Sequence, residues 1–287
     1  MEAVNMRQDI YKFVFRLMVK SLFKPKLFKV KEIADFLMEP MDYWRIQEIP
    51  QALSFIKLNG SSEKVLDIGS PKLSSLYLAS TSNSSIHSTD LIDYFIPDYE
   101  EIKKQLNLVN LFNDTADATK LKYSNEEFDY IFSISVIEHI YDDSVAMKEI
   151  ARCLKPGGSA IFTFPYHSDA VDEYHHAPYW SSEEGIVFYQ HRYNQKSLEE
   201  RIIGPSGLQT KEIRYFSEKP MGKLELNDGV LTENIHKIKR ITEFFKKIKL
   251  PIVPSLISFY FWNKYQYAVQ IPDQNTRCIL LVLEKRL

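Results

Sequence analysis

The sequence predicts an α/β protein with a mainly parallel sheet. From residue 64 onward, short apolar segments alternate with helical patterns. Such alternation is typical of strands that helical crossovers connect. The first apolar segment, residues 65–69, breaks at a glycine, and the last, residues 277–284, follows a long insertion. These observations predict a ligand site at the first turn and a late strand that returns to the sheet.

The elements follow in order along the chain. Residues 1–60 read as an N-terminal helical segment, with helices over about 10–24, 31–38 and 44–58, the first ended by Pro25. Residues 61–287 form the main domain, with an insertion over 217–276. The expected strands are residues 65–69, 85–89, 128–134, 160–164, 208–216 and 277–284. The expected helices are residues 73–79, 144–154, 194–203 and, inside the insertion, 234–250. Residues 102–109 read as a helix or a helix-to-strand transition, and residues 165–185 as a loop.

Composition narrows the class of protein. The chain has 287 residues, 45% of them hydrophobic and 26% charged, and a net charge of −2. This balance argues against a nucleic-acid partner, which needs a basic field. The two cysteines, Cys153 and Cys278, form neither a disulfide framework nor a metal framework. Lys and Arg residues interrupt the N-terminal apolar stretch, so we expect no signal peptide and a cytoplasmic location.

Acidic residues follow the first two strands of the expected sheet. Asp67 and Gly69 end the first strand, and Asp90 ends the second. A strand that breaks at a glycine and leads into a helix places a ligand near the backbone. A carboxylate about twenty residues later can accept hydrogen bonds from ribose hydroxyls. The alternative role of each aspartate is to cap a turn.

Three further motifs follow in the same region. Asp117-Ala118 lies in the loop before the strand at residues 128–134, where a carboxylate could accept a hydrogen bond from an adenine amino group. The sequence Ser135-Val136-Ile137-Glu138-His139 follows that strand. The sequence Leu154-Lys155-Pro156-Gly157-Gly158 precedes the next one, and we interpret its last four residues as a helix stop and turn.

In order and spacing, these motifs resemble those of the class I methyltransferases that depend on S-adenosylmethionine. The resemblance covers residues 64–164 well and residues 193–216 and 277–287 more loosely. It implies a Rossmann-like sheet of seven strands in the order 3-2-1-4-5-7-6, with the seventh antiparallel, plus N-terminal helices and a helical insertion between strands six and seven. It implies S-adenosylmethionine as cofactor. The implied cofactor-binding residues are Asp67, Gly69, Ser70, Asp90, Leu91, Asp117, Ala118 and Ser135.

One departure from the family pattern concerns the glycine turn. The family usually has Asp-x-Gly-x-Gly-x-Gly, whereas Pro71 and Leu73 occupy the second and third glycine positions here. Ser70 is a good helix cap and Pro71 suits a first helical position, so a compact helix start could still face the ligand. The other interpretation is a degenerate cofactor site.

Histidines are the candidate catalytic bases. His167 comes directly after the strand at residues 160–164, and His175 and His176 follow. A hydroxyl acceptor must lose its proton during methyl transfer, and histidine titrates in the right range. We prefer His167, keep His175 as a second candidate, and include His139, for which packing at the strand end is the stronger interpretation. The spacing matches no metal-ligand signature, so we expect no metal.

Two basic stretches suggest contact with an anionic surface. Residues 1–31 carry eight Lys or Arg against two acids, and a basic helix in the insertion precedes the apolar, aromatic residues 250–262. Such a pattern suits peripheral binding to an anionic membrane, or the solvated faces of helices that cover a sheet.

The sequence therefore predicts methyl transfer from S-adenosylmethionine to a small-molecule, glycan or lipid-linked acceptor, at oxygen. The alternative function is a non-catalytic, methyltransferase-like binding module with a degenerate cofactor site.

Overall fold

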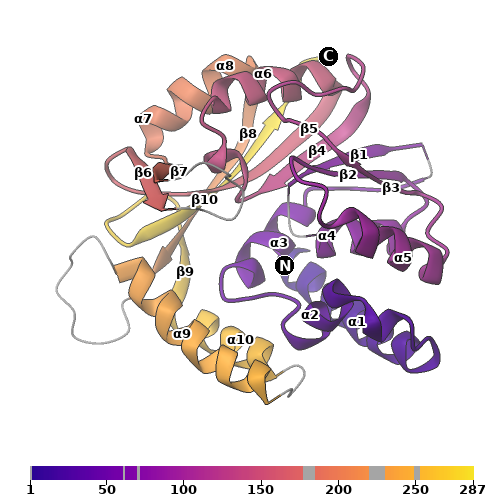
Figure 1. Ribbon diagram of the computed structural model, residues 1–287. Helices are drawn as coiled ribbons and strands as arrows, with labels where there is room; N and C mark the ends of the chain where they lie inside the picture. Colours follow the sequence, from indigo (N-terminus) through magenta and orange to yellow (C-terminus); the bar gives the residue numbers. More distant parts are fainter. Residues whose placement is uncertain (1, 61, 70–71, 177–184, 220–229, 249–252) are drawn as a thin grey trace.

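A computed structural model describes residues 2–60, 62–69, 72–176, 185–219, 230–248 and 253–287 of the protein. At its centre lies an eight-stranded sheet with the order β3-β2-β1-β4-β5-β10-β8-β9 (Figure 1). The strands are β1 (Lys64–Ile68), β2 (Ser85–Asp90), β3 (Leu111–Thr115), β4 (Phe128–Ile134), β5 (Leu154–Pro165), β8 (Gln209–Glu218), β9 (Gln266–Val269) and β10 (Thr276–Glu284).

The first seven positions of the sheet confirm the predicted strand order. The strands from β1 to β5 pair in parallel, whereas β10 is antiparallel to both β5 and β8. The late strand thus inserts between the fifth and the sixth. Strand β9 is an addition to the expected sheet, because it comes from the insertion and pairs with β8 at the edge.

The N-terminal helices pack on one face of this sheet. They are α1 (Glu2–Phe23), the short η1 (Leu27–Lys29), α2 (Lys31–Met38) and α3 (Arg45–Leu53), and α4 (Leu73–Thr81) and α5 (Ile96–Leu106) cover the same face. Ile10 and Leu53 belong to one apolar core with Val65 and Phe132 of the strands. Helix α5 ends where Asn107 adopts a left-handed conformation, with φ of 57°, so residues 102–109 are the helix end that leads into β3.

The opposite face is covered by the helices that follow β4 and β7. These are η2 (Ile137–His139), α6 (Asp143–Cys153), α7 (Gln195–Leu198), η3 (Glu199–Ile203) and α8 (Gly204–Ser206). Successive side chains of a strand point to opposite faces, so Leu66 and Ile131 pack here, against Ile150 and Ile202. The sheet is therefore buried on both sides, as parallel sheets are.

The structure corrects the expected start of the fifth strand. Helix α6 ends at Cys153, and the chain enters β5 at once instead of making a turn over residues 155–158. Gly157 N donates to Lys285 O at 2.8 Å, and Lys285 N donates to Gly158 O at 3.0 Å. These bonds hold residues 155–158 beside the end of β10. The φ of 76° at Gly157 accommodates the register shift between β4 and β5 at this point.

The structure also corrects the expected loop at residues 165–185. Within it lies β6 (Val171–His176), which pairs antiparallel with β7 (Ile186–Arg192) as a separate two-stranded sheet. Aromatic pairs across the strands hold the hairpin, with ring centroids 5.9 Å apart for Tyr174 and Phe188. The polar composition of the segment indicated a loop, but cross-strand pairs of this kind stabilise a hairpin.

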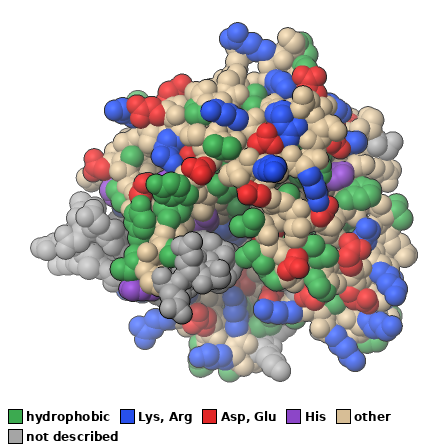
Figure 2. Space-filling view, turned by 45° about the horizontal axis from the view of Figure 1, so that its top comes forward, with side chains coloured by type: hydrophobic (Ala, Val, Ile, Leu, Met, Phe, Trp, Pro, Cys, Tyr) green, Lys and Arg blue, Asp and Glu red, His purple; other side chains and the backbone are tan. Residues whose placement is uncertain are grey.

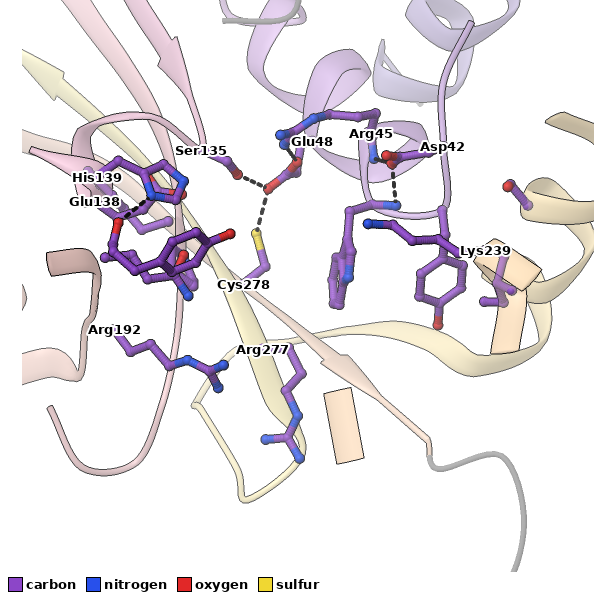
Figure 3. A pocket seen from close by; sticks show the side chains of 18 of the residues that line it. Asp42, Arg45, Glu48, Ser135, Glu138, His139, Arg192, Lys239, Arg277 and Cys278 are labelled. Atoms are coloured by element: carbon purple, nitrogen blue, oxygen red, sulfur yellow. Dashed lines mark hydrogen bonds and ion pairs between the residues drawn. The ribbon is translucent and has the colours of Figure 1, made fainter. Parts of the chain in front are cut away.

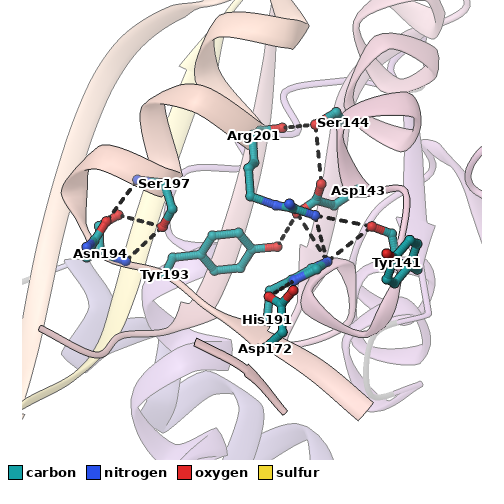
Figure 4. Close-up of polar contacts among 9 residues, drawn as sticks. All are labelled: Tyr141, Asp143, Ser144, Asp172, His191, Tyr193, Asn194, Ser197 and Arg201. Atoms are coloured by element: carbon teal, nitrogen blue, oxygen red, sulfur yellow. Dashed lines mark hydrogen bonds and ion pairs between the residues drawn. The ribbon is translucent and has the colours of Figure 1, made fainter. Parts of the chain in front are cut away.

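A buried polar network fastens the hairpin to the main sheet (Figure 4). Asp143, which is fully buried, accepts hydrogen bonds from Tyr193 Oη at 2.8 Å and Arg201 Nε at 2.9 Å. His191 Nε2 lies 2.8 Å from Arg201 Nη2 and 3.1 Å from Tyr141 O. On the other side of the ring, His191 Nδ1 lies 2.7 Å from Asp172 Oδ1. The network links β6 and β7 to α6 and η3, and so fixes the side chains that the hairpin presents.

We expect Tyr193→Phe to lower the free energy of unfolding by about 1–3 kcal/mol, because it removes a hydrogen bond to a buried carboxylate. Chemical denaturation measures the loss. Tyr215→Phe is the matched control, since Tyr215 is also buried but its hydroxyl accepts a long, 3.3 Å bond from the neutral Gln195 side chain. Equal losses in the two variants would show that Asp143 does not depend on the Tyr193 hydroxyl.

The insertion between β8 and β10 lies against the N-terminal segment. It contributes α9 (Val230–Lys247), α10 (Val253–Tyr265) and β9. Trp262 Nε1 of α10 donates to Gln47 Oε1 at 2.8 Å, and Lys246 Nζ of α9 lies 2.5 Å from Glu39 Oε2. Two regions far apart in sequence thus meet beside the sheet (Figure 1).

The visible surface carries charges of both signs. Figure 2 shows Lys and Arg side chains interspersed with Asp and Glu over this face. Such a face differs from the single-signed basic surface that is typical of nucleic-acid binding. Across the described helices, none combines the length and apolar character that crossing a bilayer requires.

Candidate functional site

The first strand ends in a buried carboxylate and a left-handed glycine. Asp67 is fully buried, and its Oδ2 accepts a hydrogen bond from Ser75 Oγ of α4. Gly69 has a φ of 65°, and a Cβ at this position would lie 2.5 Å from Val136 Cγ1. Only glycine meets both conditions without strain. The turn after β1 is therefore packed directly against the segment that follows β4.

The part of this turn that departs from the family pattern is only partly visible. Ser70 and Pro71 lie outside the described residues. Leu73 begins α4 and is buried. A helix does start at this point, and the contribution of Ser70 to cofactor binding stays a prediction.

The carboxylate that ends β2 already has a cationic partner. Asp90 Oδ2 lies 3.0 Å from Lys72 Nζ, and Asp90 Oδ1 accepts a hydrogen bond from Ile92 N at 3.3 Å. The Lys72 ammonium also lies 4.3 Å from the centre of the Phe95 ring, and this lysine is only 6% exposed. A carboxylate can accept about four hydrogen bonds, so Asp90 retains capacity for a ligand hydroxyl beside Lys72.

The remaining residues of the expected cofactor set lie around these two strand ends. Asp117 is exposed, and its Oδ1 accepts hydrogen bonds from the backbone N and the Oγ1 of Thr119, at 2.8 and 2.7 Å. It thus caps its own turn, while one oxygen, Oδ2, takes no part in those bonds. Ala118 is buried, and Leu91, directly after Asp90, is 65% exposed.

The segment after β4 joins the turn to the N-terminal helices. Ser135 has a φ of 51°, which is unusual for a residue other than glycine and is often found at functional sites. Its hydroxyl donates to Glu48 Oε1 at 2.6 Å. Glu48, on α3, is 4% exposed, forms an ion pair with Arg45, and lies 3.6 Å from Cys278 Sγ. The thiol is buried beside this carboxylate, and both effects raise the pKa of Cys278.

A second buried carboxylate follows in the same segment. Glu138 is 2% exposed, and its Oε2 has no hydrogen-bond partner among the described residues. Burial raises the pKa of Glu138 to about 8, and the negative charge of Glu48 acts in the same direction. A hydrogen bond to its own backbone and the charge of Arg45 offset part of this effect. A buried acid without a partner is costly unless a ligand or a proton satisfies it.

Both carboxylates line a cavity of about 660 Å³. Its wall is built from the N-terminal segment, the segment after β4, the β6–β7 hairpin, helices α9 and α10, and the start of β10 (Figure 3). The volume is that of a typical small-molecule site. Ser135 lies in the wall, and Val136 beside it contacts the Gly69 turn, so the cavity and the turn are separated by only one short segment.

The structure separates the three candidate histidines. His139 and His175 line the cavity, whereas His167 is not part of its wall. His139 Nδ1 donates to Tyr189 O at 2.7 Å, which makes Nε2 the basic nitrogen of the neutral ring. Burial lowers the pKa of His139. Burial thus favours the neutral form of the His139 ring. His167 hydrogen-bonds within its own loop, to Asp169.

Comparison with known proteins identifies the domain. The sequence profile of the methyltransferase-domain family matches residues 66–162. Residues 66–162 are a methyltransferase domain. A glycine/sarcosine/dimethylglycine N-methyltransferase from Actinopolyspora halophila is 31% identical over 110 residues, which are 38% of this chain and 20% of that protein. The chain spans between 16% and 38% of the length of the curated relatives that it matches.

Solved structures share the fold at low identity. The Haemonchus contortus phosphoethanolamine N-methyltransferase 2, in complex with S-adenosyl-L-methionine, matches with a TM-score of 0.52 and 19% identity, over 83% of this chain and 52% of that one. The [4+2]-cyclase SpnF matches with a TM-score of 0.50 and 14% identity, over 80% of this chain and 76% of that one. The fold of the methyltransferase domain is thereby confirmed, and the fold alone does not choose a reaction.

The residues at the turn fit the cofactor that the family implies. Ser74 Oγ, in the first turn of α4, is buried and lacks a hydrogen-bond partner within the described part of the chain. Gly69 leaves its backbone uncovered by a Cβ, and Asp90 has capacity for further hydrogen bonds. Among the described ranges, no group of His, Cys, Asp or Glu is arranged to hold a metal ion.

Sequence reasoning missed most of the residues that line the cavity of the methyltransferase domain. Glu48 and Arg45 belong to an N-terminal helix that gave only a packing signal. Arg277 lies on β10, which was an expected strand, and Arg192 lies on β7, a stretch between the expected loop and the next helix to which no element was assigned. One signal was available: Glu138 follows β4 directly, where the carboxyl ends of parallel strands gather ligand-binding groups.

We expect Asp90→Asn to weaken binding of S-adenosylhomocysteine about tenfold, because a neutral amide is a poorer acceptor for ribose hydroxyls than a carboxylate. Titration calorimetry measures the change. Asp114→Asn is the control, since Asp114 lies on the neighbouring β3 and pairs with Lys122 at the surface. A loss of equal size in the control would assign the effect to net charge rather than to Asp90.

Proposed function

We propose that the protein transfers a methyl group from S-adenosylmethionine to a hydroxyl of a small acceptor held in the cavity. The supporting observation is the position of residues 135–138, which contact the Gly69 turn on one side and line the cavity on the other. A cofactor over the turn and an acceptor in the cavity would then meet across this one segment. Positioning two reactants in this way accounts for a large part of catalysis in a displacement reaction.

The residues around the turn would hold the cofactor. Asp90 would accept hydrogen bonds from the ribose hydroxyls, with Ala118 and Leu91 beside the base. When bound, S-adenosylmethionine supplies a methyl group activated by the sulfonium to which it is attached. Asp90 would keep its ion pair with Lys72 while it accepts these bonds, because a carboxylate can accept about four hydrogen bonds.

Glu138 would accept the proton of the acceptor hydroxyl. Its Oε2 lies buried in the cavity wall with no partner in the described structure, so a hydroxyl that donates to it satisfies both groups. With a pKa near 8, the ionised carboxylate is a stronger base than an exposed glutamate, although fewer molecules are ionised at pH 7. His139 and His175 are the other candidate bases in the wall.

Calorimetry with S-adenosylmethionine and S-adenosylhomocysteine tests the proposal, followed by incubation of labelled S-adenosylmethionine with a panel of small hydroxylated acceptors. We expect binding of both cofactor forms and label transfer to at least one acceptor. If neither form binds, the protein is not a methyltransferase. One observation favours that outcome, namely the Lys72 ammonium on Asp90, and it would make the domain a non-catalytic binding module.

We also propose peripheral contact of α9 and α10 with an anionic membrane, which would suit a lipid-linked acceptor. Phe244 and Ile248, on and just after α9, and Leu256 and Tyr260 of α10 are 50–59% exposed. Lysines such as Lys247 accompany them, and apolar residues beside lysines bind anionic interfaces. We expect more protein to co-sediment with anionic than with neutral vesicles, and less of the Phe244→Ser variant. Equal recovery with both vesicle types would contradict this contact.

A further inference from the structure

We propose that the cavity has an oxyanion subsite formed by Arg192 and Arg277, so that the acceptor carries a phosphate or carboxylate group besides the hydroxyl that is methylated. The proposal rests on the proposed function, because it names the substrate class of the same cavity. It concerns the part of the wall that β7 and β10 provide, and not the part that Glu48 and Glu138 provide (Figure 3).

Arg277 is a half-buried cation that has no direct ionic partner among the described residues. Its Nη1 donates to two backbone carbonyls, Gln274 O at 2.8 Å and Thr276 O at 3.1 Å. Within the described parts of the chain, no carboxylate lies within 4 Å of its guanidinium. Burial lowers the pKa of Arg277, and the charge of Arg192 acts in the same direction, although Glu218 and Asp273 offset part of the effect. The site therefore disfavours the cation that it holds.

Arg192 brings a second guanidinium to the same region. Its Nη2 lies 2.7 Å from Glu173 Oε1, while its Nε is buried and has no hydrogen-bond partner among the described residues. A planar guanidinium offers five donors in a fixed fork. One edge of Arg192 is thus used within the hairpin, and the Nε donor remains for a ligand.

The charges of the cavity are distributed unevenly. Near Ser135, Glu48 is paired with Arg45 and Glu138 has a raised pKa. Near β10, Glu173 pairs directly with Arg192, and among the described residues it is the one acid within ion-pair distance of either arginine. The buried Glu218 accepts a 2.5 Å bond from Tyr43 Oη, and its charge acts on Arg277 from a greater distance. An oxyanion here would relieve the repulsion between the arginines and use their remaining donors.

The distribution indicates how an acceptor would lie. The hydroxyl end would contact Glu138, beside the segment that adjoins the cofactor turn, and the anionic end would contact Arg192 and Arg277. A cavity of about 660 Å³ holds a small molecule that carries both groups. Charged hydrogen bonds from the two arginines would hold the anionic end of the acceptor. The hydroxyl at its other end would then be positioned beside Glu138.

Titration calorimetry with inorganic phosphate, and separately with acetate, tests the subsite at constant ionic strength. Each titration is made with and without saturating S-adenosylhomocysteine. Anion binding that disappears when S-adenosylhomocysteine is present is assigned to the cofactor turn and not to the arginines. We expect phosphate to bind the saturated protein. We expect Arg277→Gln to weaken that binding at least about tenfold, while Arg277→Lys retains part of it. Arg16→Gln is the control, since Arg16 is an exposed residue of α1.

The outcomes separate the two proposals. Absence of phosphate and acetate binding, with S-adenosylhomocysteine still bound, overturns the oxyanion subsite and leaves the proposed function intact. Equal binding by wild type and a folded Arg277→Gln variant overturns it as well. Loss of affinity in Arg277→Gln but not in Arg16→Gln supports it, and comparison of phosphate with acetate then tells a phosphoryl from a carboxylate acceptor. Failure of S-adenosylhomocysteine to bind contradicts the proposed function instead.

Discussion

Replacing Glu138 by glutamine is expected to lower the rate of methyl transfer by about 10²–10⁴-fold, the contribution of a positioned general base. The substitution keeps the size of the side chain and removes the carboxylate that would accept the proton. The rate is measured with labelled S-adenosylmethionine and the best acceptor of the panel. Binding of S-adenosylhomocysteine should be unchanged, because Glu138 lines the cavity and not the Gly69 turn.

The pH dependence gives this prediction a signature. Because the ionised form of Glu138 accepts the proton, the wild-type rate should rise with pH and level off above pH 8, the pKa of this group. The rise should be absent from the residual activity of the variant. Glu149→Gln on α6 is the control, since Glu149 pairs with Arg152 outside the cavity. If Glu138→Gln keeps near wild-type activity, Glu138 is not the base, and His139 or His175 takes that role.

The same raised pKa has a consequence for stability. An acid whose pKa is higher in the folded state stabilises the fold below its unfolded value, near 4.5, and this contribution is lost as the pH rises through about 8. We therefore expect Glu138→Gln to raise the melting temperature relative to wild type at pH 9, by at least about 2 °C, and to have little effect at pH 5.

Replacing Gly69 by alanine is expected to reduce both stability and cofactor affinity. A left-handed backbone costs an L-residue about 1–2 kcal/mol. The new Cβ would also meet Val136 Cγ1 at 2.5 Å, and overpacking of this kind costs about 1–3 kcal/mol more. The melting temperature should fall by at least about 4 °C. Affinity for S-adenosylhomocysteine should fall at least about tenfold, because the turn must move away from the segment that follows β4.

Gly207 provides a close control for this experiment. Its φ of 64° matches that of Gly69, but a Cβ there would meet nothing within 4 Å. Gly207→Ala should therefore show only the cost of the left-handed backbone, with cofactor affinity unchanged. Equal effects of the two substitutions on stability and affinity would mean that the contact with Val136 has no role.

Most of the fold could be predicted from the sequence, because most helices and strands are visible in the pattern of a short stretch of residues. Residues 65–69 and 277–284 are apolar runs that become buried strands, and the family resemblance implied the position of the late strand between the fifth and the sixth, as observed. The hairpin of β6 and β7 was missed because β6 shows no alternation of apolar and polar residues: Val171 and Tyr174 are three residues apart, and a register shift lies between Glu173 and Tyr174. Its register depends on pairing across residues that are distant in sequence, which a local pattern does not reveal.

Only the part of the candidate site at the carboxyl ends of β1 and β2 could be predicted from the sequence. Asp67, Gly69 and Asp90 lie in or directly after the last residues of β1 and β2, so the order of the motifs located them. Glu48, from the N-terminal segment, comes to the cavity through tertiary packing alone. Nothing in the local pattern predicts that its carboxylate meets Ser135 at 2.6 Å, or that Lys72 pairs with Asp90.

A crystal structure of the protein with S-adenosylhomocysteine tests the proposed cofactor site most directly. We expect the ligand to lie over the carboxyl ends of β1 and β2, with its ribose at Asp90 and its sulfur directed across residues 135–138 toward the cavity. A ligand bound elsewhere, or one whose sulfur points away from Glu138, would contradict the proposed site.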